Sequence, residues 1–284
     1  MHGAWELSGS HRAHLLAPLL VLGTAYAVGW WRLSRRARRF APWRLALALG
    51  SLAGLAVALL SPLDTLAHQL FVAHMVQHML LIAVAAPALL LANPLVALLW
   101  ALPARARVRA GRLLVRNAPL RRLWETLTWA PLAWLSHAVV LWVWHMPPAY
   151  DAALAHRLLH DFEHLAFFVT AILYWWPVID PAPHVARSLH PSLRVVYVVV
   201  GALQTAGLGL LLATRSTVLY APYRVPGKWA LDPLDDQALG GVVMWGIGGA
   251  VDMLAVILLL YRFFAATARP PSLTPPPAYG KMSH

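Results

Sequence analysis

The segment AHQLFVAHMVQHMLLIAVAAPALLLA, residues 67–92, combines two properties that rarely occur together. It is apolar and long enough to cross about 30 Å of hydrocarbon as a helix. It nevertheless carries three histidines, His68, His74 and His78. Because ionisable side chains are costly to place inside an apolar span, their presence there indicates a functional site. The segment therefore predicts a membrane protein whose site is built into its own spans.

Six further apolar runs of comparable length accompany this segment. The chain of 284 residues is 60% hydrophobic and only 12% charged, a balance outside that of soluble globular domains. We therefore expect an all-α, polytopic membrane domain of seven transmembrane helices over residues 1–267. Residues 268–284 are rich in proline and are expected to form a disordered cytoplasmic tail. The seven predicted spans are 14–31, 43–60, 67–92, 124–145, 153–179, 194–214 and 237–262.

The basic residues fall mainly on one side of this predicted bundle. Of the 23 Lys and Arg residues, 18 lie in alternate connections and in the C-terminal segment. Connections rich in positive charge stay in the cytoplasm, so the N-terminus is expected outside and the C-terminus inside. Arginines follow the first apolar run, which is therefore expected to be retained as a span. The net charge of +12 is attributed to membrane orientation, and no nucleic-acid partner is expected.

Three further features of the sequence predict local structure in the connection 94–116 and in the last two spans. Residues 94–116 read either as an amphipathic helix on the anionic inner surface or as an ordinary basic loop. The glycines of the last span are expected to permit close helix packing; they are Gly240, Gly241, Gly246, Gly248 and Gly249. Gln204 and Asp252 fall at a similar depth in the last two spans. They are expected to form a hydrogen-bonded structural pair rather than a proton relay.

Eight of the 14 histidines fall in three predicted spans, and all should lie in the outer half of the membrane. Positions four apart share one face of a helix, which places His74 above His78 and makes a ladder of the three histidines in the span 153–179. A buried histidine is more often a packing residue than a ligand, but lipid offers no water to satisfy so many imidazoles. We therefore predict that imidazoles from three spans converge on one metal ion. The candidate ligands are His68, His74, His78, His137, His145, His156, His160 and His164.

The residue types around these histidines favour copper. The chain has no cysteine, so thiolate sites are excluded. Imidazole suits copper, zinc and iron, and the neighbouring thioethers of Met75 and Met79 would add a preference for Cu(I). Asp64 and Glu163 are expected beside the ligands, where carboxylates orient imidazoles through the second ring nitrogen.

Five segments together carry a resemblance to a known family. They are SPLD at 61–64, AHMVQHMLL at 73–81, WHMPPAYDAAL at 144–154, LHDFEH at 159–164 and DQALGGVVMW at 236–245. On these segments the chain resembles the multi-span CtaG family, the assembly factors of caa-type cytochrome c oxidase. In the last span the family pattern has a proline-containing turn after Met-Trp. This chain reads Gly246-Ile-Gly-Gly249 there, so a kink at this point is not implied.

The resemblance implies a bacterial plasma-membrane protein that matures the oxidase by handling copper. Membrane-embedded oxidase subunits would be its partners, and a copper donor would act from the periplasmic or extracellular side. His137 and His156 lie outside the family pattern, so their role rests on spacing alone. The family pattern reaches Asp64, His68, His74, His78, His145, Asp151, His160, Glu163 and His164.

The sequence leaves two alternatives to copper delivery. Two histidines on facing helices could ligate haem and make the protein an electron-carrying membrane cytochrome. A copper importer would need a polar path to the cytoplasm, for which only Gln204 and Asp252 are available. An enzyme is not expected, because no nucleophile, phosphate-binding loop or pair of acid-base carboxylates is evident.

Overall fold

A computed structural model describes residues 9–36, 40–115, 117–186, 188–225, 229 and 231–267. This part of the chain contains helices and no strands. Six helices are long and apolar enough to span a membrane, and a bent pair of helices raises the number to seven. The elements are α1 Gly9–Ser34, α2 Pro42–Leu60, α3 Pro62–Ala67, α4 Phe71–Met79, the π-helix η1 Leu80–Ala85, α5 Ala86–Leu91, α6 Pro94–Ala101, α7 Ala104–Arg112, α8 Pro119–Leu127, α9 Ala130–Trp144, α10 Pro147–Ala155, α11 Arg157–Ile179, α12 Pro191–Thr214, the 3-10 helix η2 Ala221–Tyr223 and α13 Pro233–Thr267.

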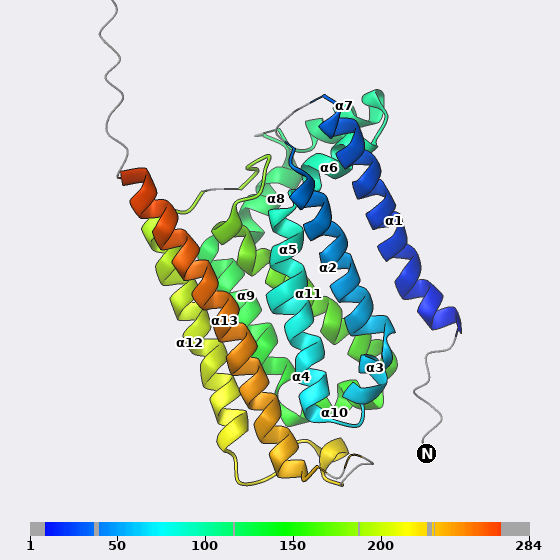
Figure 1. Cartoon of the computed structure of the whole chain (residues 1–284), viewed down its shortest axis with the longest axis vertical. Coiled ribbons are helices and arrows are strands. Elements are labelled where there is room, and N and C mark those ends of the chain that lie inside the picture. The colour runs from blue at the N-terminus through cyan, green and yellow to red at the C-terminus, as the bar shows by residue number, and fades with distance from the viewer. Residues whose placement is uncertain are drawn as a thin grey trace, which may run out of the picture.

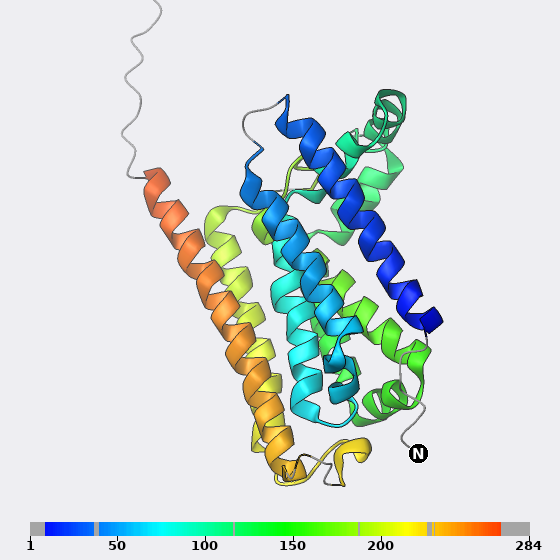
Figure 2. The same cartoon turned by 45° about the vertical axis from the view of Figure 1, so that its right-hand side comes forward.

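The two spans that carry most of the histidines form the centre of the bundle. Within one apolar 18-residue stretch of each, 61% of the residues are buried in the span Phe71–Leu91 and in α11, but only 11% in α13. The outer helices surround them, with α2 and α1 on one side and the α12–α13 pair on the other (Figures 1 and 2). Polar groups on the central spans are therefore shielded from lipid by neighbouring helices.

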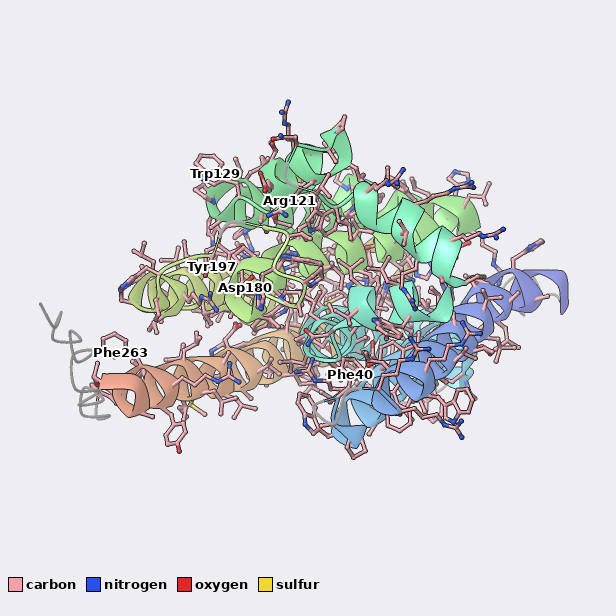
Figure 3. All side chains as sticks on the ribbon, turned by 90° about the horizontal axis from the view of Figure 1, so that it is seen from above. Phe40, Arg121, Trp129, Asp180, Tyr197 and Phe263 are labelled. Atoms are coloured by element: carbon pink, nitrogen blue, oxygen red, sulfur yellow. The ribbon has the colours of Figure 1, made fainter. Side chains whose placement is uncertain are left out.

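The two ends of the bundle differ in chemistry. One end carries α7, with Arg105, Arg107, Arg109 and Arg112, and is called the arginine end here. Figure 3 looks onto this end and shows Arg121 and Asp180 near its middle. The opposite end carries α3, α10 and η2, which lie at the bottom of Figure 1, and is called the histidine end.

The fourth predicted span is wrong as a single helix. Helix α8 and helix α9 are bent by 63° relative to each other. Trp129 has extended backbone angles, and Pro131 follows in the first turn of α9. Proline is tolerated there because its missing N–H would have had no intrahelical partner. The 15 residues of α9 reach only about 22 Å, so this span is short.

The start of the fifth predicted span is also wrong. Helix α10 ends at Ala155, and α11 begins at Arg157. His156 between them has extended angles of φ −130° and ψ 110°. The chain therefore turns sharply at His156, and α10 lies across the histidine end instead of continuing the span.

One other segment differs from the single element that the sequence suggested. The connection 94–116 forms two short helices, α6 and α7, separated at Leu102 and Pro103, rather than one amphipathic helix. By contrast, α13 runs unbroken for 35 residues through Gly246-Ile-Gly-Gly249, so no kink occurs there. The predicted tail, residues 268–284, lies outside the described part of the chain.

A π-helix interrupts the central span just after His78. Pro87 has no N–H to donate, so the preceding turn cannot keep regular α-helical bonding. Two carbonyls of this turn are bound by side chains of neighbouring helices. Trp175 Nε1 donates to the oxygen of Ile82 at 3.2 Å, and Ser51 Oγ donates to that of Ala85 at 2.8 Å. These bonds fix the rotation of α4, and with it the direction of its histidines.

Candidate metal centre

Six histidines from four segments meet at the histidine end of the bundle. Ring centroids lie 4.3 Å apart for His74 and His78, and 4.2 Å apart for His160 and His164. His78 lies 5.3 Å from His164, which joins the α4 and α11 pairs. His145 lies 5.8 Å from His78, and His68 lies 5.0 Å from His160. The histidine cluster is therefore defined as His68, His74, His78, His145, His160 and His164.

The carboxylate of Glu163 also belongs to this centre. Its Oε1 lies 3.7 Å from His78 Nε2, and both side chains are completely buried. Neither of its oxygens has a hydrogen-bond partner. The sequence had placed Glu163 behind the imidazoles as an orienting group. In the structure it faces the same space as the imidazoles and offers its own oxygens to it.

The tautomer of His145 is fixed by the backbone of its own helix. Its Nδ1 lies 2.7 Å from the carbonyl oxygen of Leu141, which can only accept, so Nδ1 carries the proton. A neutral ring with its proton on Nδ1 has a lone pair on Nε2. His145 Nε2 is buried and has no hydrogen-bond partner. This imidazole is therefore oriented as metal-ligating histidines are.

A chain of tyrosine hydroxyls binds the Nδ1 atom of His74. Tyr223 donates its hydroxyl hydrogen to the oxygen of Ala67 at 2.5 Å, and Tyr150 lies 3.4 Å from Tyr223. His74 Nδ1 lies 2.7 Å from the Tyr150 hydroxyl and 3.2 Å from that of Tyr223. Every hydroxyl has an acceptor if His74 Nδ1–H donates to Tyr150, Tyr150 to Tyr223, and Tyr223 to Ala67. This arrangement leaves a lone pair on His74 Nε2.

Buried polar atoms without partners accumulate at this one place. They include the Nε2 atoms of His74, His78, His145 and His164 together with both oxygens of Glu163. A buried polar atom without a hydrogen bond costs about 1–3 kcal/mol, and native proteins contain few of them. A cation among these atoms would satisfy the lone pairs and the carboxylate at once. The atoms present therefore fit a metal ion.

Three overlapping sets of donor atoms could hold such an ion. In each set the three donor atoms lie within 4.8 Å of one another. Donors bound tetrahedrally at about 2.1 Å from an ion are about 3.4 Å apart, so each set must contract by up to about 1.4 Å to hold one. The sets are Asp64 with His68 and His160; His74 with His160 and Glu163; and His74 with His78 and His164.

The sets form a series from the half-buried to the fully buried. His68 is partly exposed, whereas His74 and His78 are completely buried. Burial, together with the positive charge of Arg157, lowers the pKa of His68 to about 4. Its imidazole is therefore neutral at pH 7 and can offer a lone pair at the entrance of the series.

The loop between α12 and α13 covers the cluster. Tyr220 donates its hydroxyl hydrogen to the oxygen of His145 at 2.9 Å. Asp151 on α10 accepts a hydrogen bond from the backbone N–H of Ala221 at 3.2 Å. Asp151, which the family pattern includes among the site residues, therefore holds the covering loop. The loop supplies Tyr220 and Tyr223 to the wall of the site.

Two of the eight predicted ligands lie outside the cluster. His156 is exposed and precedes α11, so the predicted ladder of three histidines is wrong in its first member. His137 is buried, but its Nδ1 lies 3.2 Å from the hydroxyl of Thr170. His137 also lines a separate cavity of about 30 Å³, together with Tyr174 and Asp252. The cavity is large enough for one water molecule.

The methionines and the second polar pair also differ from expectation. Met75 packs against Gly240 through Cγ and Met79 against Gly248 through its sulfur, so both side chains contact α13. Gln204 binds Trp142 Nε1 at 2.9 Å and the hydroxyl of Thr205 at 3.1 Å. Among the bonds of the described chain, none joins Gln204 to Asp252, so the predicted structural pair is wrong.

The sequence analysis missed three contributions to the site. Tyr150 was inside a quoted motif but had no assigned role, because a hydroxyl 76 positions from His74 gives no local signal. Asp236 accepts from the backbone N–H groups of Phe71 and Val72 at 2.6 and 2.9 Å, and so caps the start of α4. Gln77 donates to Asp64 at 3.1 Å and to the oxygen of Ala58 at 2.7 Å. These are long-range contacts that spacing within one helix cannot reveal.

Comparison with known proteins supports the same family as the sequence motifs. An uncharacterized protein of Mycobacterium leprae is 27% identical over 269 residues, which cover 89% of this chain and 38% of the relative. Uncharacterized proteins of Mycobacterium bovis and Mycobacterium tuberculosis are each 25% identical over 259 residues, covering 86% of this chain and 37% of each relative. The chain thus spans less than two-fifths of the length of these relatives. No solved structure matches it.

The family model described as cytochrome c oxidase caa3 assembly factor matches residues 24–266. This match includes every helix from α2 to α12 and all residues of the histidine cluster. The chain therefore belongs to the CtaG family of cytochrome c oxidase caa3 assembly factors.

Proposed function

We propose that this protein binds copper in the histidine cluster and delivers it to a metal centre of the oxidase during assembly. The observation that carries the proposal is the convergence of buried Nε2 atoms and the Glu163 carboxylate, none of which has a hydrogen-bond partner there. A binding and delivery role needs no catalytic group. It requires only a site that can accept the ion, hold it away from water and release it to a docked partner.

The donor atoms support copper, but on different grounds from those that the sequence suggested. The methionine side chains that favoured Cu(I) contact α13, while a carboxylate joins the imidazoles. Sites of nitrogen and oxygen donors bind Cu²⁺ more tightly than the other divalent ions of the first transition row. Copper therefore remains the proposed ion, and Cu²⁺ fits this donor set well.

The overlapping donor sets support movement of the ion as well as binding. His160 belongs to the outer and middle sets, and His74 belongs to the middle and inner sets. An ion can then pass from the partly exposed His68 to the buried His78 by exchanging ligands, without ever losing all of them. Transfer to an oxidase subunit would use the reverse path through His68.

The charge distribution supports an orientation in a bacterial plasma membrane. The arginine end carries the arginines of α7 together with Arg32 and Arg121, and the histidine cluster lies at the opposite end. Basic connections stay in the cytoplasm. The cluster would thus face the outside, where a copper donor and the exposed parts of oxidase subunits are accessible.

The geometry favours an ion over the two alternatives. Ring centroids 4.2–5.9 Å apart give an ion-sized centre, whereas haem needs a wide planar space between its two imidazoles. Import would need a polar path toward the arginine end. The cavity beside His137 and Asp252 has a volume of only about 30 Å³, far too small for such a path.

The proposal is tested by copper titration of the purified protein in detergent. We expect about one copper ion to be retained per chain, with nitrogen hyperfine structure in the electron paramagnetic resonance spectrum of the Cu²⁺ form. His156→Ala serves as a matched control, because this histidine is exposed and lies outside the cluster. It should bind copper as the wild type does. Absence of retained copper, or a haem absorption band, would contradict the proposal.

Glu163→Gln is expected to weaken copper binding by about 100-fold without destabilising the empty protein, because glutamine keeps the shape and removes the charge. At a copper concentration of 100 times the wild-type Kd, binding stabilises the wild type by about 2.7 kcal/mol and the variant by only about 0.4 kcal/mol. Thermal unfolding with and without copper measures both effects. Equal stabilisation of the two proteins would show that Glu163 does not bind the ion.

Tyr150→Phe is expected to weaken copper binding by about 10-fold, because His74 Nδ1 loses its hydrogen-bond partner and the ring is no longer held with Nε2 toward the cluster. Tyr150 is a positioning residue, so the signature is a changed nitrogen hyperfine pattern with the stoichiometry preserved. Tyr197→Phe is the control, since this buried hydroxyl binds Tyr174 far from the cluster. An unchanged spectrum for Tyr150→Phe would refute the assigned role.

A further inference from the structure

A second candidate binding site lies at the arginine end, far from the histidine cluster. A cavity of about 350 Å³ opens there between the end of α1 and the α6–α7 connection. Its chemistry is set by four arginines and two tryptophans. These are Arg32, Arg35, Arg36, Arg107, Trp31 and Trp100.

The cavity exists because α1 and α6 approach each other very closely. A Cβ atom at Gly29 would overlap the backbone of Ala97, so only glycine permits this contact. The contact brings the C-terminal turn of α1 beside that of α6. Arg32 Nη1 then donates to the oxygen of Ala101 at 2.7 Å and fixes the two helix ends to each other.

Tryptophan rings hold the remaining guanidinium groups in place. Arg35 Cζ lies 4.1 Å from the ring centroid of Trp31. Arg107 Cζ and Arg36 Cζ lie 4.2 and 5.6 Å from the ring centroid of Trp100. A guanidinium group that contacts an indole ring with its face keeps its N–H edge available for a second partner.

These four positive charges lack negative partners within the described chain. The arginine ion pairs of the described chain involve Arg121 and Arg194, and none involves an arginine of the cavity. Guanidinium groups bind phosphate oxygens in a two-pronged geometry. The site is therefore prepared for an anion with several oxygens.

The position of the cavity indicates which anion it meets. It lies at the end of the membrane-spanning helix Ala13–Ser34, where Trp31 and Trp100 are placed as interfacial tryptophans are. The phosphates of lipids lie at this level, and basic pockets between helix ends bind acidic headgroups. We propose that this cavity binds the phosphate headgroup of one anionic phospholipid.

The test measures lipid binding by the delipidated full-length protein in detergent, using native mass spectrometry with phosphatidylglycerol and phosphatidylcholine. We expect one phosphatidylglycerol to bind at least about tenfold more tightly than phosphatidylcholine. The variant R35A/R107A, which removes two charge-assisted partners, should weaken phosphatidylglycerol binding by about tenfold or more.

The matched control is R109A/R112A, which removes the same charge from the same end. Arg109 and Arg112 line a different surface hollow that contains no tryptophan. This variant should bind phosphatidylglycerol within about threefold of wild type. Equal losses in both variants would show general electrostatic attraction and overturn the site. Displacement of the lipid by millimolar inorganic phosphate would assign the cavity to free phosphate and overturn the lipid proposal.

Discussion

A His74→Ala, His78→Ala double variant is expected to purify as a folded protein without copper. His74 belongs to two of the three donor sets, and His78 belongs to the innermost set. A site of four ligands binds a metal ion with about 10–16 kcal/mol, so the loss of two ligands should weaken binding on the order of 10⁴-fold. Metal analysis of the protein purified from membranes measures this effect directly.

The control for the double variant is His137→Ala. This residue is also a buried imidazole on a central helix, but it binds Thr170 outside the cluster. Its replacement removes similar packing and should leave copper binding intact. Circular dichroism of all three proteins verifies that they are folded. Equal copper contents in the double variant and the wild type would show that the histidine cluster is not the copper site.

The cellular consequence follows from the same variant. If the cluster supplies copper, cells that carry only the double variant should assemble the oxidase without its copper and lose its activity, whereas His137→Ala should support activity. Added copper that bypasses delivery should restore activity in the double variant. If cells with the double variant, which retains no copper, had normal oxidase activity, oxidase assembly would not depend on the histidine cluster.

Gly241→Leu is expected to have the largest effect on stability. Helices α12 and α13 cross here in direct backbone contact, with a Cβ at Gly241 falling 2.6 Å from the backbone nitrogen of Ala213. On the facing helix, a Cβ at Gly209 would lie 2.8 Å from the oxygen of Gly241. Backbone atoms cannot move aside as a flexible side chain can. Overpacking of this kind typically costs about 3 kcal/mol or more, and here it forces the two helices apart.

Gly246→Leu provides a matched control on the same helix. A Cβ at Gly246 meets nothing within 4 Å, and the residue is exposed to the surroundings of the bundle. Leucine should therefore be neutral there or stabilise α13 by up to about 1 kcal/mol, because it favours the helix more than glycine does. Thermal unfolding and size-exclusion chromatography in detergent compare the variants. Similar behaviour of both would refute close packing at Gly241.

The membrane fold could be predicted well because its signals are local. Apolar runs of sufficient length reveal spans without knowledge of their neighbours. The predicted helix boundaries were wrong where the local backbone breaks the helix although the residues around the break are apolar. Residues 124–145 are apolar throughout, yet Trp129 and Pro131 bend the span by 63°. His156 likewise ends a run that hydropathy alone would continue.

The candidate site could be predicted only in part. The spacing of His74 with His78, and of His160 with His164, placed each pair on one helix face, and both pairs meet in the cluster. His137 was predicted on the same grounds, as a histidine in an apolar span at a similar depth, but it lines a different cavity. Spacing gives the angle between residues of one helix. It does not give the rotation of that helix relative to its neighbours.

The amino-acid sequence alone was sufficient for the class of fold, the family and the set of histidines from which the site is drawn, because hydropathy and periodicity are properties of consecutive residues. The three-dimensional packing settled which imidazoles lie together, that Glu163 lies beside them, and that tyrosine hydroxyls bind His74. The physical reason is that these features depend on contacts between residues such as His74 and Tyr223, which are 149 positions apart and meet only after the helices have packed.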